Sequence, residues 1–352
     1  MAKKHSIMAR TGGIAFAASL LASPVMASPF TDLFIFGDSL VDAGNTQAAV
    51  LASTGGTVDP TPAEAGYFMG RFTNGPDYTD LLSQSLFGTL TTASLFGGDN
   101  FSFGGARARD NTLDATPDPD GGDPTPTGDT LPDLVAQVDA FIASGKAAGE
   151  GSLAVINVGG NDLFDLTFGN TNGLSAEDFT DEIIEAITSQ VERLDEAGVG
   201  NILVAGIPDV GGVPIVLEAG LGDAGRANSL EVAPMLEDAL AELDLDANLS
   251  TFDFIGLFDD VLANLEVFGL PADLDLTTPC LVGTGGGAPD VDCTSFAFFD
   301  GVHVTAPFHE IIFDEVSSIL GLDAVDVPAP GAVGLMLFGL GGLVAARRRN
   351  AA

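Results

Sequence analysis

The chain has 352 residues and is strongly acidic, because 12 Lys and Arg residues face 50 Asp and Glu residues and leave a formal net charge of −38. A charge of this sign repels polyphosphates and argues against nucleic acid as a partner. Apolar residues make up 46% of the chain and occur throughout it, which excludes a disordered acidic tail and predicts a substantial core. We interpret the acidic excess as a surface adapted to salty surroundings, with divalent-cation binding by some of the Asp clusters as the alternative.

Residues 1–27 have the pattern of a secretory signal peptide. A basic start that includes Lys3 and Lys4 is followed by an apolar run over residues 14–22, and residues 25–27 provide the small side chains that signal peptidase reads. The alternative is an uncleaved membrane anchor, but the apolar run is too short to span a bilayer. The mature protein is therefore expected to be exported.

Residues 28–326 alternate apolar, strand-like runs with helical patterns, which predicts a single α/β domain with a mainly parallel sheet. The first strand is expected at 32–36. The composition of 46–75, rich in Thr, Ala, Gly and Pro, predicts a loop, and apolar residues at helical spacing predict a helix over 77–87. A short strand is expected at 100–103.

The next stretch, 110–132, is rich in Asp, Pro, Gly and Thr and has no periodicity, which predicts a surface insertion. Calcium binding there is the alternative, although the spacing of an EF-hand is absent. The pattern then predicts a helix over 134–142 and a strongly apolar strand over 152–158. Ser175, with an acid three residues later, indicates the start of a helix that ends near Gly198.

The remaining predicted elements are a strand, a helix, a strand, an irregular segment and a helix, at 201–207, 226–243, 252–255, 270–299 and 305–320. The irregular segment contains both cysteines, Cys280 and Cys293, with 12 residues between them. In an exported chain such a pair predicts a local disulfide. Neither cysteine has a neighbouring histidine, so a zinc site is not indicated.

The C-terminal residues 327–352 also have the pattern of an address. A Val-Pro-Ala-Pro stretch precedes an apolar, glycine-rich run of 16 residues over 331–346, and three arginines follow at 347–349. At 1.5 Å per residue this run would span roughly 24 Å, less than the hydrocarbon core of about 30 Å. The pattern resembles the PEP-CTERM sorting signal, which implies transient retention in the inner membrane until an exosortase cleaves it. Ala329 stands where that motif usually has Glu, and a plain membrane anchor is the alternative.

Ser39 is a candidate nucleophile, because it follows the first strand after Gly37 and the ligands of open α/β folds bind beyond the carboxyl ends of their strands. A hydroxyl needs a base, and the mature chain offers only His303 and His309. His303 lies just before the last helix, and Asp300 lies three residues earlier, where it can accept the other imidazole proton. We interpret His309, inside the helix pattern, as a structural or surface residue.

Charge that develops on an acyl oxygen needs donors, and backbone N–H groups beside glycine or a side-chain amide serve that purpose. Gly105 follows the short strand expected at 100–103, and Asn161 follows the double glycine after the strand at 152–158. Each is therefore a candidate oxyanion donor. The alternative is that both are ordinary turn residues.

Four blocks occur in an order that resembles the GDSL or SGNH hydrolases, namely Gly37-Asp38-Ser39, Gly104-Gly105-Ala106, Gly159-Gly160-Asn161-Asp162 and the pair Asp300 and His303. The resemblance covers almost all of 30–320 and implies a three-layer α/β/α sandwich of flavodoxin-like type. It implies that Ser39 is the nucleophile and an oxyanion donor, with Gly105 and Asn161 as the other donors. It also implies that His303 is the base and Asp300 the acid that orients it. Val304 departs from the proline that many members have after this histidine.

The predicted activity is that of an exported serine esterase or lipase that forms an acyl-enzyme and requires no metal or organic cofactor. The expected partners are an ester substrate (a lipid, a small ester or an acylated glycan), signal peptidase and an exosortase-type enzyme, and the expected location is the periplasm, the cell surface or the medium. One alternative is an acyltransferase or deacetylase acting on extracellular polysaccharide. Another is a catalytically silent surface or adhesion protein on the same scaffold.

Overall fold

The computed structural model of the protein describes residues 29–110 and 131–322. The expected signal peptide at 1–27, nearly all of the insertion at 110–132 and the C-terminal signal at 327–352 lie outside these ranges. The fold is an α/β fold built on one sheet of four parallel strands in the order β1-β2-β3-β4. The strands are β1 (Asp32–Gly37), β2 (Ser152–Asn157), β3 (Asn201–Ala205) and β4 (Asn248–Phe252).

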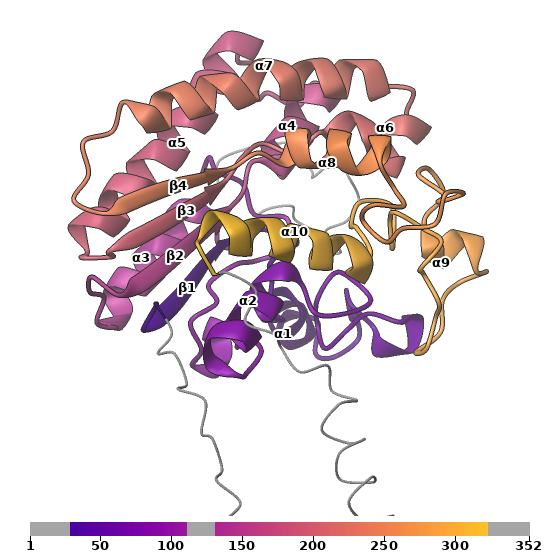
Figure 1. Ribbon diagram of the computed structural model, residues 1–352, viewed down its shortest axis with the longest axis horizontal. Helices are drawn as coiled ribbons and strands as arrows, with labels where there is room; N and C mark the ends of the chain where they lie inside the picture. The colour runs from indigo at the N-terminus through magenta and orange to yellow at the C-terminus, as the bar shows by residue number, and fades with distance from the viewer. Residues whose placement is uncertain (1–28, 111–130, 323–352) are drawn as a thin grey trace, which may run out of the picture.

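The helices flank the sheet on both sides (Figure 1). They are α1 (Asn45–Ser53), α2 (Tyr78–Phe87), α3 (Leu134–Ser144), α4 (Gly160–Phe168), α5 (Ala176–Glu196), α6 (Pro214–Glu218), α7 (Gly222–Ala241), α8 (Phe254–Ala263), α9 (Cys280–Gly283) and α10 (Ala306–Ile319). Short 3-10 turns lie at η1 (Ala63–Ala65), η2 (Ser94–Phe96) and η3 (Val210–Gly212). Within the described ranges, no helix combines the length and the apolar run needed to cross a membrane.

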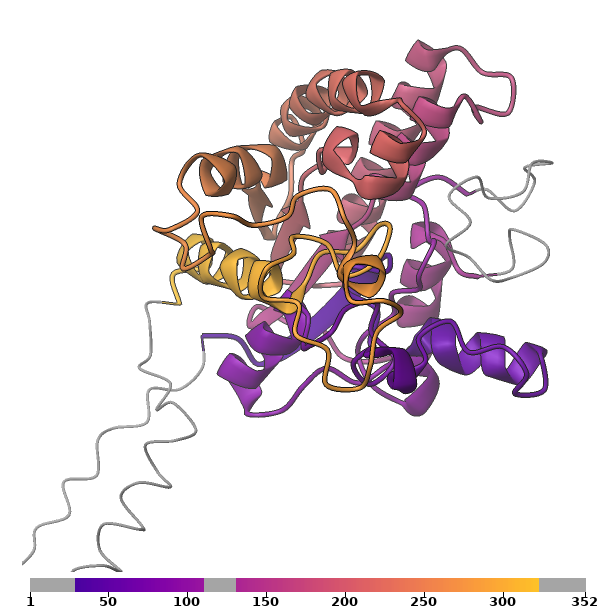
Figure 2. The same ribbon diagram turned by 90° about the vertical axis from the view of Figure 1, so that its right-hand side faces the viewer.

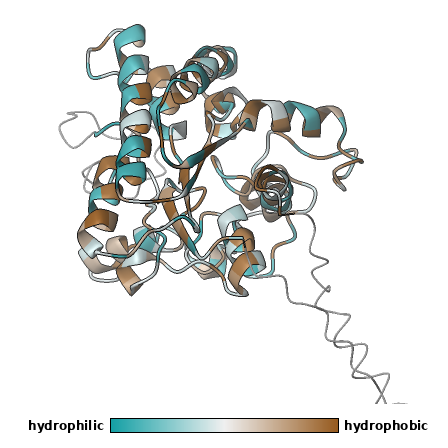
Figure 3. Ribbon diagram, turned by 60° about the vertical axis from the view of Figure 1, so that its left-hand side comes forward, coloured by the Kyte–Doolittle hydropathy of each residue, from teal (hydrophilic) through white to brown (hydrophobic). Residues whose placement is uncertain are grey.

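Alternation along the strands divides the core into two layers, since successive strand side chains point to opposite faces of a sheet. Phe34 and Phe36 of β1 face one way and pack with residues of α3, α4, α5 and α7. Leu33 and Ile35 face the other way and pack with residues of α2 and α10. In Figure 3 the strands are mostly brown, while the helices alternate brown and teal. This arrangement confirms the predicted three-layer α/β/α fold.

All four strands run in one direction, so their carboxyl ends meet at one edge of the sheet. Figure 2 looks onto this edge, where the orange segment between α8 and α10 crosses in front of the sheet. The edge therefore collects the ends of β1 and β2 together with the loop that precedes α10.

Three of the predicted elements differ in the structure. The predicted loop at 46–75 contains α1, whose first N–H groups are accepted by the buried carboxylate of Asp42 at 2.7–3.1 Å. The predicted strand at 100–103 forms only isolated bridges, from Asn100 to Ile35 and to Ala93. The side chain of Asn100 donates to the carbonyl of Val41, so this segment serves the loop after β1 rather than extending the sheet.

The predicted strand at 252–255 is also displaced. The fourth strand ends at Phe252, and α8 begins at Phe254 after Asp253, whose carboxylate accepts the N–H of Gly256 at 2.9 Å. An N-terminal cap of this kind competes with continuation of the strand. The helix start predicted at Ser175 is correct, since its hydroxyl accepts the N–H of Asp178.

Candidate active site

A tight turn after β1 presents Ser39. Gly37 has φ +156°, and a Cβ there would lie 2.1 Å from the carbonyl oxygen of Asn157, so only glycine permits the ends of β1 and β2 to approach this closely. The N–H of Asp38 donates to that same carbonyl at 3.0 Å, and its carboxylate accepts the N–H of Leu40 at 3.0 Å. The turn leaves the Ser39 side chain half-buried at the carboxyl edge of the sheet.

His303 joins Ser39 to Asp300. Its Nε2 lies 2.7 Å from Ser39 Oγ, and its Nδ1 lies 2.8 and 2.9 Å from the two carboxylate oxygens of Asp300. Asp300 Oδ1 also accepts the backbone N–H groups of Val302 and His303 at 2.9 and 2.8 Å. Burial alone would raise the pKa of Asp300, but the neighbouring His303 and these hydrogen bonds hold it below its usual value. Asp300 is therefore a carboxylate that can accept a hydrogen bond from Nδ1–H.

Tyr67 is a contact of this acid that the sequence reasoning missed. Its hydroxyl donates to Asp300 Oδ2 at 2.9 Å, and its ring meets Phe299 edge-on with centroids 4.8 Å apart. The two residues lie 233 positions apart in the chain, so no local pattern could have paired them. With Tyr67, every oxygen of the Asp300 carboxylate has at least two donors.

The disulfide predicted from the cysteine pair is present and packs against Phe299, the residue before Asp300. Cys280 and Cys293 are bonded, with Cα atoms 5.5 Å apart, and they pack with Phe299 in a small core of their own. The N–H of Leu281 donates to the carbonyl of Phe299 at 3.0 Å. The disulfide-closed segment thus braces the residue immediately before Asp300.

Two of the candidate oxyanion donors, Gly105 and Asn161, lie on segments that contact each other. Asn161 lies in the first turn of α4, and its Nδ2 donates to the carbonyl of Ala106 at 2.9 Å, which ties it to the loop that carries Gly105. Gly104 N–H is held by Asp42 Oδ2 at 3.0 Å and by the Thr46 hydroxyl. Within the described part of the chain, the N–H groups of Ser39 and Gly105 make no hydrogen bond, so both remain available to a substrate oxygen.

His309 does not take part in this arrangement. It is buried on α10, and its Nδ1 accepts the N–H of Tyr78 at 3.3 Å, against whose ring it stacks. Burial lowers the pKa of His309 to about 3, which keeps the imidazole neutral in the core. The sequence indicated that His309 is a structural or surface residue, and the structure shows that it is structural. His303 is therefore the histidine in contact with Ser39.

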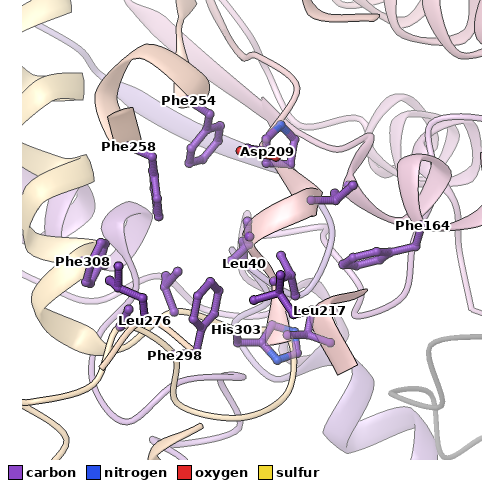
Figure 4. Close-up of a pocket in the computed structure, with 18 of the residues that line it drawn as sticks. Leu40, Phe164, Asp209, Leu217, Phe254, Phe258, Leu276, Phe298, His303 and Phe308 are labelled. Atoms are coloured by element: carbon purple, nitrogen blue, oxygen red, sulfur yellow. The ribbon is translucent and has the colours of Figure 1, made fainter. Parts of the chain in front are cut away.

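A cavity of ≈ 250 Å³ opens beside Ser39, Asn161 and His303. Its wall is mainly apolar and comes from α4, α6, α8, α10 and the segment before α10 (Figure 4). In that view Phe254, Phe258 and Phe308 form one side and His303 lies at another, with Leu40 between them. Sequence reasoning missed these aromatic residues as site residues, because each belongs to a helix whose apolar face is indistinguishable from ordinary core.

Asp38 makes the stability of the folded protein depend on pH. Burial raises the pKa of Asp38 from 3.8 to about 7, although the N–H of Leu40 and the nearby His303 lower it in part. Between about pH 4 and 7 the folded chain therefore holds a proton that the unfolded chain has released. The stability that Asp38 contributes is full below this window and falls as the pH rises through it.

We expect Asp38→Asn to abolish this dependence. The difference in unfolding free energy between variant and parent should shift in favour of the variant by up to about 4 kcal/mol from pH 4 to pH 8, the equivalent of roughly three pKa units. Urea unfolding of both proteins across this range measures it. Asp273→Asn, at an exposed carboxylate, provides the control with a nearly constant difference. A constant difference for Asp38→Asn as well would contradict the expectation.

Residues 33–316 match the family model described as GDSL-like Lipase/Acylhydrolase. The chain belongs to this family. The GDSL assignment made from the four sequence blocks is thus confirmed, and the protein is a hydrolase acting on ester bonds. A second model, the PEP-CTERM protein-sorting motif, matches residues 326–350 and indicates export and sorting to the cell surface.

Relatives of this GDSL hydrolase include plant and bacterial proteins. The chain is 28% identical over 325 residues to a GDSL esterase/lipase of Arabidopsis thaliana, which covers 79% of this chain and 84% of the relative. It is 28% identical over 267 residues to Lipase 1 of Photorhabdus luminescens, covering 73% of this chain and 34% of that lipase. A carbohydrate acetylesterase from Sinorhizobium meliloti aligns in structure with a TM-score of 0.42 and 13% identity, over 83% of this chain and 98% of the other.

Proposed function

We propose that this GDSL hydrolase cleaves carboxylic esters through a covalent acyl-enzyme on Ser39. The observation that carries the proposal is the unbroken contact from Ser39 Oγ through both nitrogens of His303 to the carboxylate of Asp300. A serine hydroxyl is almost un-ionised at neutral pH, so it needs a base within hydrogen-bond reach. The distance of 2.7 Å to Nε2 meets this requirement.

In the first half-reaction Ser39 Oγ attacks the ester carbonyl carbon while His303 Nε2 takes the hydroxyl proton. The N–H groups of Ser39 and Gly105 and the amide of Asn161 stabilise the oxyanion. When the carbon–oxygen bond to the alcohol breaks, His303 returns the proton to the departing oxygen. Asp300 keeps the proton of Nδ1 in place and stabilises the imidazolium throughout.

In the second half-reaction water replaces the alcohol. His303 takes a proton from the water, the resulting hydroxide attacks the acyl carbon, and the bond to Ser39 Oγ breaks as that oxygen recovers the proton from His303. The products are a carboxylic acid and the free enzyme. Every proton moves between groups that the chain, the ester and water supply.

We also propose the organisation of the exported protein. Residues 1–27 act as a signal peptide removed by signal peptidase, 28–326 form the hydrolase domain, and 327–352 act as a sorting signal that holds the chain in the inner membrane until an exosortase-type enzyme cleaves it. The basic residues at both ends and the match to the sorting motif support this scheme. Ala329, in place of the usual Glu, is the residue to test for its effect on processing.

A fluorophosphonate probe tests the nucleophile. Such probes phosphonylate an activated serine hydroxyl with loss of fluoride, and they react slowly with ordinary serines. We expect one stoichiometric adduct at Ser39, identified by peptide mass spectrometry, and no adduct when the protein is unfolded first. An adduct at another serine, or none in the folded protein, would contradict the proposal and favour a silent scaffold.

A further inference from the structure

The cavity beside Ser39 is larger than an acetyl group requires. Its volume is ≈ 250 Å³, and it extends from Ser39 and His303 to Phe308 of α10 and to Phe254 and Phe258 of α8. A two-carbon acyl group attached to Ser39 would occupy only the end next to the nucleophile. The rest of the cavity extends beyond that end between protein walls, so it is a site for something longer.

The wall of this cavity is suited to a hydrocarbon chain. Phe258 lies between Phe254 and Phe308, with ring centroids 6.3 and 5.4 Å away, and these rings form a continuous apolar surface (Figure 4). Leu40, the residue after the nucleophile, lies between these rings and His303. Sugar recognition relies on converging hydrogen-bonding groups, whereas an apolar wall gains affinity from buried hydrocarbon.

The one arginine that lines the described cavity is paired with two carboxylates of the same wall. The guanidinium of Arg226 contacts the carboxylate of Asp259 at 2.8 and 3.1 Å and also pairs with Asp209. One cation between two anions offers no unmatched positive charge to a ligand. This cluster therefore favours a neutral occupant over an anionic one.

The rim of the cavity is apolar as well. Leu217, Leu262 and Leu276 line it and are 39, 43 and 37% exposed, on a protein with a formal net charge of −38. Large apolar side chains gathered at the mouth of an apolar cavity extend the surface on which a hydrocarbon chain can be buried.

From these observations we infer that the cavity is an acyl-chain site and that the enzyme prefers esters of medium-chain fatty acids to acetyl esters. The inference rests on the proposed function, since it assumes acylation of Ser39. The acyl part is the better occupant because it stays covalently bound through both half-reactions, while the alcohol must leave before water enters. An apolar cavity directly beside the nucleophile suits the part that stays.

The expected size of the preference follows from hydrocarbon burial. Each methylene removed from water into an apolar site favours binding about fourfold. The octanoyl ester has six more methylenes than the acetyl ester, so kcat/KM should rise by roughly three to four powers of ten between them, and then level off or fall once the cavity is full.

The experiment measures kcat/KM of the purified full-length protein for p-nitrophenyl esters from two to sixteen acyl carbons. Phe258→Ala should move the optimum to longer chains, and Ala297→Leu, at a buried residue of the wall, should move it to shorter ones. Phe96→Ala, at an exposed ring outside the cavity, is the matched control and should leave the profile unchanged. Ratios between chain lengths are compared, so a partly unfolded variant still reports its preference.

Three results would overturn the inference: an acetyl ester or acetylated xylan as the best substrate, a profile unaltered by Phe258→Ala, or a stronger dependence on the alcohol chain than on the acyl chain. In each case hydrolysis that still depends on Ser39 would leave the proposed function standing. Absence of hydrolysis for every ester, with no probe adduct at Ser39, would instead overturn the proposed function itself.

Discussion

Ser39→Ala is expected to lower kcat/KM for a p-nitrophenyl ester by roughly four to six powers of ten, the range seen when a serine hydrolase loses its nucleophile. The residual rate would come from the oxyanion donors, which remain in place. The substitution removes one half-buried hydroxyl whose only described partner is His303, so the fold should persist. Ester hydrolysis measured by stopped assay, with thermal unfolding in parallel, checks both statements.

The control for this variant is Ser53→Ala at the end of α1. Its hydroxyl donates to the carbonyl of Val50 within the same helix and makes no described contact with a site residue. Turnover of this variant should equal that of the parent. If Ser39→Ala retained more than a small fraction of the parent's turnover while remaining folded, Ser39 could not be the nucleophile.

Asp300→Asn is expected to lower kcat by about three to four powers of ten with little change in volume. The carboxylate accepts a hydrogen bond from His303 Nδ1–H, and an amide that turns its NH₂ toward Nδ1 would favour the tautomer protonated on Nε2. That tautomer cannot accept the proton of Ser39. The charge that stabilises the imidazolium would be lost as well. Steady-state kinetics from pH 5 to 10 measures the effect, and the residual rate should rise toward high pH.

Two further variants separate charge from position. Asp290→Asn removes an exposed carboxylate from the same irregular segment and should leave kcat unchanged. Tyr67→Phe removes one donor to Asp300 Oδ2 but keeps both contacts to His303 Nδ1, so we expect a loss below about tenfold. A loss for Asp300→Asn no larger than that for Tyr67→Phe would refute the role of Asp300 as the orienting acid.

The parts of the fold that were predicted correctly have strong local signals. The strand at 152–158 is a continuous apolar run, and the helix that begins after Ser175 has a cap and a long amphipathic repeat. The missed helices lack such signals. Asn45–Ser53 is short and rich in small residues, and the carboxylate that accepts its first N–H groups, that of Asp42, belongs to the preceding loop. Phe254 and its neighbours form a short apolar run that fits a strand and a helix equally well.

The sequence by itself determined the candidates for the chemistry of this protein: a serine after a strand end, one histidine with an acid three residues before it, and glycine and amide groups near the ends of two other segments. Each of these signals lies within a few consecutive residues. Because parallel strands place their carboxyl ends at one edge of the sheet, residues that follow different strands are expected to lie near one another. Only the tertiary structure decided that His303 reaches Ser39 at 2.7 Å, that Tyr67 supports Asp300, and that α8 and α10 enclose a cavity beside them. Such contacts join residues far apart in the chain, and they depend on how the helices pack rather than on any pattern along it.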